Sequence, residues 1–434
     1  MTSKDEPSDE EMRKRLLPNP SDEELLAAVT KSFAKPGQKV SIVKKLESYD
    51  DKNFWVDING THYLAKCHNG VESRDFIKLW KEESAHEKSV IHLQTTIMKH
   101  LNENGITTSL PQSPINNNSN SDDELPIPAS IHQMPVSSKD DSPCDLVLRL
   151  FSWVPGRTMN SVTMLPLEAL ADAGRFLGNL SKTLSAIDTS KLAACKRYHQ
   201  WDGKNTRDLK DFVQYVDDPT RKSMVESLIA TFQEQLIDSK EADKLPVGLI
   251  HADFNDANIL LDENCCVSGV IDFGDAVESW RVLDLSVAMA YSMLSTYATP
   301  NRGISAAAAF LRGYSSVCTL TAEEKSHLVL LIACRLSCSV TLGAYSYKQS
   351  PGNEYLLLHA KPGWDALGMI WGTDVEQRKE MRATLDKIFE QACSNVKKGE
   401  TGVIDCSDLS FPDPRVVDPF GDMRTKSNKK RKVL

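Results

Sequence analysis

The sequence predicts an α+β protein in which a small antiparallel β lobe with one main helix precedes a larger, mostly helical lobe. Two observations predict this order. Between residues 39 and 67, short segments of β-forming residues alternate with turn-like segments. Beyond residue 157, apolar residues recur at helical spacing over long segments.

The composition is that of an ordinary globular protein and argues against several classes. The chain has 434 residues, of which 41% are hydrophobic, so it can bury a sizeable core. Its net charge of -9 argues against a nucleic-acid-binding protein, because affinity for phosphate backbones needs clustered Lys and Arg. The N-terminus lacks the apolar segment of a signal peptide, and no uninterrupted apolar run is long enough for a membrane span. We therefore expect a cytoplasmic protein with no nucleic-acid or membrane partner.

The N-terminal lobe is expected to span residues 21–150, after a disordered, highly charged segment over residues 1–20. Ser21 and Glu24 have the spacing of a capping box, which predicts a helix that begins there. The strands that follow are expected in VSIVKKLE, FWVDI and THYLAKC, and an Asn-Gly turn joins the last two. These three strands predict the antiparallel sheet.

A helix and an insertion come next in this lobe. Apolar residues at helical spacing predict a helix from Val90 to Leu101. Residues 108–143 are rich in Ser, Asn, Asp and Pro and poor in large apolar residues, so burial cannot offset the entropy cost of ordering them. We therefore expect a disordered insertion. The strand DLVLRLFSWV follows, and residues 151–157 are the expected connector to the second lobe.

The second lobe, expected over residues 151–400, is predicted to be mainly helical. Leu170 and Leu177 recur on one face of a helix. Thr321 and Glu324 are expected to cap another helix, whose segment LVLLIACRL is apolar on nearly all sides, so this helix should lie in the interior. Residues 401–434 are expected to form a polar tail. The tail ends in the basic segment KSNKKRKVL, which is either a solubilising end or a nuclear-entry signal.

One segment, VGLIHADFNDANILLDENCCVSGVIDFGDA, carries the strongest functional pattern. Apolar strand-like stretches flank a polar loop, and a second apolar strand ends at Asp272. Two successive strand ends can bring Asp253, Asn258 and Asp272 into one cleft. The pattern HxDxxxxN, followed 14 residues later by the Asp of DFG, matches the kinase catalytic loop and its metal-binding motif. A polar hairpin whose Asp and Asn only cap turns would explain single residues but not the joint pattern.

Phosphoryl transfer suits these side chains. That reaction needs a carboxylate to deprotonate the acceptor hydroxyl, oxygen ligands for Mg²⁺ and cations for the phosphates. We therefore assign Asp253 as the catalytic base and Asn258 and Asp272 as Mg²⁺ ligands, whereas His251 is expected to be structural. The predicted reaction transfers the terminal phosphoryl group of a nucleoside triphosphate to a hydroxyl of a small molecule.

The first lobe is expected to bind the nucleotide. Lys66, at the end of the third strand, is the expected cation for the inner phosphates, the alternative being an ordinary surface lysine. A Glu on the following helix usually pairs with such a lysine. Here the inward position is Gln94, whose amide can hydrogen-bond Lys66 without a countercharge, and Glu87 is the alternative partner. Ser48 and Asn53, where a glycine-rich loop would belong, are expected to bind phosphate oxygens.

The segments HADFNDANILL and VIDFGD resemble the HGDxxxxN and IDF(x)D motifs of the aminoglycoside phosphotransferase and choline kinase superfamily. Within it, SYDDKNFWV, LRLFSWVPGR, LTAEEKSHLVLLIACRLSCSVTLGAYSY and KPGWDAL are similar to the hydroxylysine kinase family, over about residues 21–372. The resemblance implies a protein-kinase-like two-lobed fold. It also implies Mg²⁺- and GTP-dependent phosphorylation of the 5-hydroxyl of 5-hydroxy-L-lysine in lysine degradation. Ala252 stands where that superfamily commonly has Gly, and the alanine should be tolerated if this residue keeps ordinary backbone angles.

An acceptor with two ammonium groups and a carboxylate needs acids near the hydroxyl and at least one cation. Asp256, Asp275, Glu278 and Arg281 lie close in sequence to the proposed centre and are the candidate substrate contacts, with solvated loop charges as the alternative. Asp284 is expected either to cap the following helix or to act in binding.

Three other functions remain open from the sequence. A protein kinase would also need a glycine-rich loop and a longer activation segment ending in APE, which this chain lacks. A kinase of another amino alcohol, such as choline, ethanolamine or an aminoglycoside, would keep the fold and change the acceptor. A pseudokinase scaffold would not require the triad of Asp253, Asn258 and Asp272. The choice between GTP and ATP depends on backbone geometry that the sequence does not give.

Overall fold

The computed structural model describes residues 9–411 apart from residues 47, 49, 83–87, 116–126, 139–142, 163, 296–301, 350–359, 395, 397 and 400–401. These residues form two compact units. The first contains the chain up to Pro155 together with Ile187–Arg197 and Gly269–Gly274. The second contains Gly156–Ala186, Tyr198–Ser268 and the chain from Asp275 onward. The sequence placed the two later segments of the first unit in the second lobe, because predicted boundaries follow the chain rather than its contacts.

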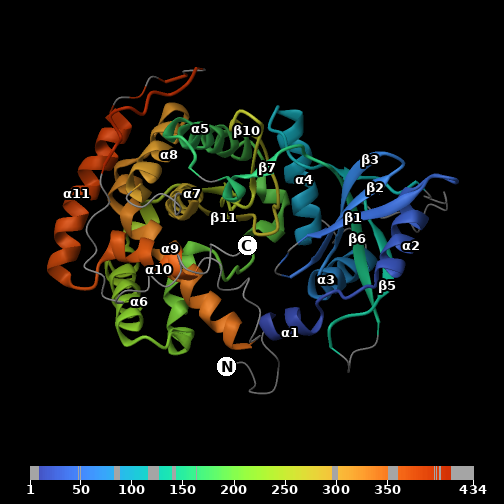
Figure 1. Cartoon of the computed structure of the whole chain (residues 1–434). Coiled ribbons are helices and arrows are strands. Elements are labelled where there is room, and N and C mark those ends of the chain that lie inside the picture. The colour runs from blue at the N-terminus through green and yellow to red at the C-terminus, as the bar shows by residue number, and fades with distance from the viewer. Residues whose placement is uncertain are drawn as a thin grey trace, which may run out of the picture. The chain divides into compact units, whose positions relative to one another are not determined.

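An antiparallel sheet forms the centre of the first unit (Figure 1). Its strands run in the order β1-β2-β3-β6-β4, and β5 also pairs with β6. The Asn59-Gly60 turn joins β2 to β3, and both turn residues have the positive φ that such a two-residue hairpin requires. The strands are β1 (Val40–Leu46), β2 (Lys52–Ile58), β3 (Thr61–Cys67), β4 (Pro111–Gln112), β5 (Ser130–Met134) and β6 (Cys144–Ser152).

Helices accompany this sheet and bury its apolar residues. Ser21 and Glu24 form both hydrogen bonds of the predicted capping box at the start of α2. In α4, three of the four residues at the predicted helical spacing, Leu93, Ile97 and Leu101, are buried, whereas Val90 at the start of the helix is partly buried. The helices are α1 (Asp9–Arg15), α2 (Asp22–Phe33), α3 (Gly70–Lys81) and α4 (Val90–Glu103).

The prediction of a disordered segment over residues 1–20 is wrong for residues 9–20, and residues 1–8 lie outside the described part. Residues 9–15 form α1, and the Leu16 side chain that follows is only 1% exposed. Leu16 lies so close to Gly70 that a Cβ there would be 2.8 Å from the Leu16 Cβ. The charged composition predicted that too little apolar surface would be buried to offset the entropy cost of ordering this segment. Burial of this leucine against the start of α3 supplies that apolar contact.

The predicted disorder of residues 108–143 is also wrong where the structure describes them. Strand β5 pairs along β6, and the side chains of Ile127, Ala129, Met134 and Val136 are buried. Each of the pairs Ile127/Ala129 and Met134/Val136 has the two-residue spacing of a strand face, but the five-residue gap between the pairs and the Ser, Asn and Pro on either side conceal that pattern. Residues 116–126 and 139–142 of the predicted insertion lie outside the described residues.

The second unit is mainly helical, as predicted. The helix that contains LVLLIACRL is α9, and 78% of its most apolar window is buried inside the protein. By length and composition alone α9 could cross a membrane, but its burial is that of a core helix. The helices are α5 (Leu167–Leu184), α6 (Pro219–Phe232), α7 (Val282–Ser295), α8 (Gly303–Val317), α9 (Ala322–Gln349), α10 (Ala360–Trp371) and α11 (Val375–Ser394).

Two small sheets and several short helical turns complete the described chain. One sheet pairs β11 with β8, and the other has the order β10-β9-β7. The strands are β7 (Arg157–Thr158), β8 (Val247–Ile250), β9 (Ile259–Leu261), β10 (Val267–Val270) and β11 (Val277–Trp280). The short turns are Met159–Ser161, Thr189–Lys191, Ala193–Lys196, Gly203–Asp211, Val213–Tyr215, Gln233–Asp238 and Glu241–Lys244.

Within the predicted polar tail over residues 401–434, residues 402–411 dock on the second unit. Ile404 and Leu409 are buried, and the buried guanidinium of Arg312 on α8 donates to the Asp405 carbonyl and to the Asp408 carboxylate. The few apolar residues and one ion pair are enough to dock this short segment. Residues 412–434, including the basic KSNKKRKVL, lie outside the described residues.

Close packing of α5 against α8 gives a test of this core. A Cβ at Gly313 would collide with the backbone carbonyl of Ala171, and backbone cannot move aside cheaply. We expect Gly313→Ala to lower the free energy of unfolding by about 1–3 kcal/mol, measured by urea denaturation. Gly248→Ala is the matched control, because nothing lies within 4 Å of its added Cβ. Equal stabilities of the two variants would contradict the packing.

Candidate active site

The loop between β8 and β9 carries the HADFNDAN pattern, and the buried carboxylate of Asp284 anchors it. Asp284 lies near the start of α7 and accepts the backbone N–H groups of His251 at 2.9 Å and Ala252 at 2.7 Å. Its side chain is 1% exposed, and burial raises its pKa above the ordinary value although both amides and His251 oppose this. The structure therefore gives Asp284 a role that was not one of the two expected for it: its carboxylate holds the loop.

Ala252 does not keep the ordinary backbone angles under which the sequence predicted that an alanine would be tolerated. Its φ is 65°, in the left-handed region that favours glycine. The left-handed turn presents the amides of His251 and Ala252 to the same carboxylate, so the Asp284 contacts offset the strain. A glycine, which has no Cβ, would adopt this conformation without the strain.

Asp253 is held through both oxygens of its carboxylate. Its Oδ2 accepts from Nδ2 of Asn258 at 2.9 Å, and its Oδ1 accepts from Nη2 of Arg335 at 2.6 Å. The Asn258 Nδ2 also donates to the Asp253 carbonyl at 2.9 Å, and the Asp253 N–H donates to Nδ1 of His251 at 3.2 Å. The structure thus brings Asp253 and Asn258 together, with His251 as a buried support. Because Asn258 uses its nitrogen in these bonds, its Oδ1 is the atom left for a cation.

Arg335, on α9, is a contact that the sequence did not predict. Its side chain is 6% exposed and lies 82 residues from Asp253 in sequence, so no local pattern could have revealed the pair. Burial alone would lower the pKa of Arg335, but Tyr291 and Asp253 raise it above its ordinary value.

Lys66 and Asp272 lie together in the first unit. Lys66 is 8% exposed, and its Nζ is 3.4 Å from Oδ1 of Asp272, which also accepts the Gly274 N–H. Val270, two residues before Asp272, donates its N–H to the Thr107 carbonyl, which ties this segment to the first unit. Asp272 has a φ of 62°, and its side chain is 45% exposed.

Among the described residues, Gln94 and Lys66 have other partners than the hydrogen bond expected between them. Lys66 instead pairs at 2.8 Å with Asp51, which precedes β2, whereas Gln94 accepts a hydrogen bond from Arg149 at 3.0 Å. Burial alone would lower the pKa of Lys66, but the carboxylates of Asp272 and Asp51 raise it above its ordinary value. The alternative partner, Glu87, lies outside the described residues.

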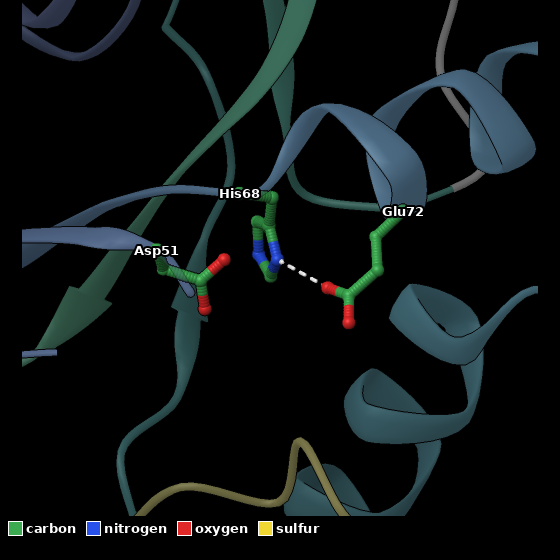
Figure 2. Close-up of side chains that lie close together, drawn as sticks. All are labelled: Asp51, His68 and Glu72. Carbon is green, nitrogen blue, oxygen red and sulfur yellow. Dashed lines mark hydrogen bonds and ion pairs between the residues drawn. The ribbon is translucent and has the colours of Figure 1, made fainter. Parts of the chain in front are cut away.

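Asp51 belongs to a wider charge network. Figure 2 shows the His68 ring between the carboxylates of Asp51 and Glu72, and their ligand-type atoms lie within 4.8 Å of one another. His68 Nδ1 is 3.4 Å from Glu72, whose other oxygen is 3.3 Å from Arg13. Since Lys66 and Arg13 already neutralise these carboxylates, the cluster is better explained as support for Lys66 than as a metal site.

The two predicted phosphate-binding side chains lie on either side of Asp51. Ser48 Oγ accepts the Asp51 N–H at 3.3 Å, so it stabilises the turn that presents Asp51. Asn53 pairs with Lys66 in the β2-β3 register, and its buried Oδ1 has no hydrogen-bond partner among the described residues. Asn53 therefore retains an unused acceptor next to the lysine.

The four candidate substrate contacts differ in how exposed their side chains are and in whether another residue already pairs with them. Arg281 is paired with the fully buried carboxylate of Glu324, which argues against substrate binding by Arg281. Asp256 is only 2% exposed, which argues against substrate binding by this residue too. Glu278 lies in β11 with its carbonyl bonded to Lys204. The carboxylate of Asp275 is 33% exposed and 3.4 Å from His199, which leaves it as the best placed of the four for a ligand.

Comparison with known proteins identifies the family. The model of the family described as "Phosphotransferase enzyme family" matches residues 43–326. The chain is 28% identical to hydroxylysine kinase of Xenopus laevis, over 76% of this chain and 85% of the relative. It is also 28% identical to hydroxylysine kinase of Bos taurus, over 82% of this chain and 92% of the relative.

Solved structures support the same fold. A microcompartment-associated aminopropanol kinase aligns with a TM-score of 0.56 at 15% identity, covering 84% of this chain and 98% of the other. The amicoumacin kinase hAmiN aligns with a TM-score of 0.52 at 15% identity, covering 90% and 97%. The predicted kinase-like α+β fold is thereby confirmed. The chain belongs to the phosphotransferase enzyme family, whose model spans the HADFNDAN and IDFGD segments.

Proposed function

We propose that this chain transfers the γ-phosphoryl group of GTP to the 5-hydroxyl of 5-hydroxy-L-lysine. One observation carries the catalytic part of the proposal: the Asp253 carboxylate is fixed at both oxygens in a loop that is itself anchored to Asp284. The acceptor follows from similarity to hydroxylysine kinases from several vertebrates over 76–84% of the chain.

Asp253 is the proposed base. Its carboxylate accepts the proton of the acceptor hydroxyl while that oxygen forms a bond to the γ-phosphorus. The bond between the γ-phosphorus and the bridging oxygen breaks, and the nucleoside diphosphate leaves with both electrons of that bond. A carboxylate held at both oxygens has little freedom to turn away from the acceptor, which is the positioning that phosphoryl transfer needs.

Asn258 and Asp272 are the proposed Mg²⁺ ligands. Amide and carboxylate oxygens suit this hard cation, and Asn258 keeps its Oδ1 free of the hydrogen bonds that its nitrogen makes. Bound Mg²⁺ would neutralise charge on the phosphates. The hAmiN kinase structure contains AMP-PNP and Ca²⁺, which supports a nucleotide and a divalent cation in this family.

Lys66 is the proposed contact to the inner phosphates of the nucleotide. Its raised pKa keeps the ammonium charged at neutral pH. Asp51 and Asp272 hold it at the end of β3, where Asn53 adds an amide. The pairing with Asp51 fixes the lysine before a nucleotide arrives, so less entropy is lost on binding.

A kinase of another amino alcohol is the second candidate. Its support is the aminopropanol kinase fold and a local match, 40% identical over 89 residues, to homoserine kinase of Granulibacter bethesdensis. That match covers only 20% of this chain.

A panel assay of nucleoside diphosphate release separates these candidates. GTP and ATP are each tested with 5-hydroxy-L-lysine, L-homoserine, ethanolamine, choline and an aminoglycoside. We expect the highest kcat/KM with GTP and 5-hydroxy-L-lysine, and L-lysine, which lacks the hydroxyl, should give none. Preference for another acceptor would replace the substrate assignment, and no turnover with any pair would indicate a pseudokinase.

Replacing the base gives the sharpest catalytic test. Asp253→Asn should lower kcat by about 10²–10⁴-fold, because the amide cannot accept the proton, while nucleotide binding measured by calorimetry stays close to wild type. Asp262→Asn, in the exposed turn after β9, is the control and should keep full activity. Normal turnover by the Asp253 variant would remove this residue from the chemistry.

The Lys66 pair gives a separate test of nucleotide binding. Asp51→Asn removes the closer carboxylate partner of Lys66, so we expect the nucleotide KM to rise about tenfold, equivalent to about 1.4 kcal/mol. The acceptor KM should change little. Asp57→Asn, at the far end of β2, is the matched control. If both variants had the wild-type nucleotide KM, Asp51 would not position the lysine.

A further inference from the structure

Arg335 places a guanidinium almost completely out of water, and it forms an ion pair with the carboxylate of the proposed base. Removing a guanidinium from water costs several kcal/mol unless hydrogen bonds and an opposite charge compensate it. Nη2 donates to Asp253 Oδ1 at 2.6 Å and Nη1 donates to the Trp201 carbonyl at 3.4 Å. The buried Nε has no hydrogen-bond partner among the residues that the structure describes. Asp253 therefore supplies an opposite charge in direct contact with this buried guanidinium.

Two aromatic rings fix the guanidinium in place. Its central carbon lies 5.4 Å from the ring of Trp201 and 5.3 Å from the ring of Tyr291, both within the range of cation–π attraction. Trp201 lies before the turn that begins at Gly203, and Tyr291 lies on α7. Arg335 itself projects from α9, which is packed in the core. Three separate segments of one unit therefore determine where the positive charge stands.

We propose that Arg335 is a positioning residue that sets the orientation of Asp253 for proton transfer. This inference rests on the proposed function. Asn258 holds Oδ2 of the carboxylate and Arg335 holds Oδ1, so the two together fix the rotation of the side chain about its last bond. Asn258 also has a proposed cation to bind, whereas Arg335 has no other assigned task. Arg335 is thus the dedicated support of the base.

The burial of Arg335 argues against direct recognition of an acceptor carboxylate. Only 6% of its side chain is exposed, whereas 23% of the Asp253 side chain is exposed. An incoming carboxylate would have to displace Asp253 from the guanidinium and would leave that acid unpaired. A positioning role predicts loss of kcat, whereas substrate recognition predicts a rise of the acceptor KM.

The test compares Arg335→Ala and Arg335→Lys with Arg378→Ala. Arg378 is the matched control because it also lies on a helix of the second unit, its guanidinium stacks 4.8 Å from Trp371, and its Nε is equally without a partner among the described residues. Folding of every variant is checked by thermal unfolding. The kinetics are measured with the donor and acceptor that give the best wild-type turnover.

We expect Arg335→Ala to lower kcat about 100-fold with little change in either KM, because a misplaced catalytic group costs about that factor. Arg335→Lys keeps the charge but lacks the planar fork, so it should recover only part of the loss. Added guanidinium at concentrations far below denaturing ones should raise kcat of Arg335→Ala, because the ion can enter the space beside Trp201 and Tyr291. The same addition should not raise kcat of Asp253→Asn or Arg378→Ala.

Several outcomes would overturn the inference. Wild-type kcat in a folded Arg335 variant would do so, as would a raised acceptor KM with unchanged kcat, which indicates substrate recognition. If Arg335→Ala does not fold, the test rests on Arg335→Lys. Wild-type kcat and wild-type thermal stability in Arg335→Lys would then show that the planar guanidinium does not position Asp253. Absence of turnover in the wild-type protein would instead overturn the proposed function and this inference with it.

Discussion

The hydrogen bonds from two consecutive backbone amides to the buried carboxylate of Asp284 are the constraint on which the HADFNDAN loop depends. Without that acceptor, the N–H groups of His251 and Ala252 would be buried without partners, at a cost of about 1–3 kcal/mol each. The carboxylate also offsets the left-handed conformation of Ala252, which costs about 1–2 kcal/mol for a residue with a Cβ. The position of Asp253, one residue later, follows from this anchor.

Each unit contains one buried cation that is paired with a carboxylate of the catalytic pattern: Lys66 with Asp272 in the first and Arg335 with Asp253 in the second. Buried ion pairs add little net stability, because desolvation cancels most of the attraction. These ion pairs instead fix the positions of the side chains, because a buried charge that is costly to leave unpaired holds its partner in one place. The same physics explains why both cations come from elements with extensive packing, a central strand and the core helix α9.

The sequence predicted what depends on local pattern and missed what depends on contacts through space. The strands around the Asn59-Gly60 turn and the capping boxes at Ser21 and Thr321 are local, and the structure confirms them. The bond between Arg335 and Asp253 joins residues 82 positions apart, and its donor lies within an apolar helix that predicts only burial. The ordered part of the insertion was missed because composition, averaged over a window, conceals a short strand such as β5.

The absence of a glutamate at position 94 has a physical explanation in the neighbouring strand. Arg149 on β6 lies directly opposite Lys66 on β3, is fully buried, and has its pKa lowered to about 9 by that burial. It donates to Gln94 at 3.0 Å and to Thr95 at 2.7 Å, so α4 supplies neutral acceptors to this second cation. The countercharge for Lys66 comes instead from Asp51, before β2. Of these two neighbouring buried cations, Arg149 thus takes its partners from α4 and Lys66 takes its partner from the segment before β2. A lysine without a glutamate on the helix therefore remains compatible with a nucleotide-binding role.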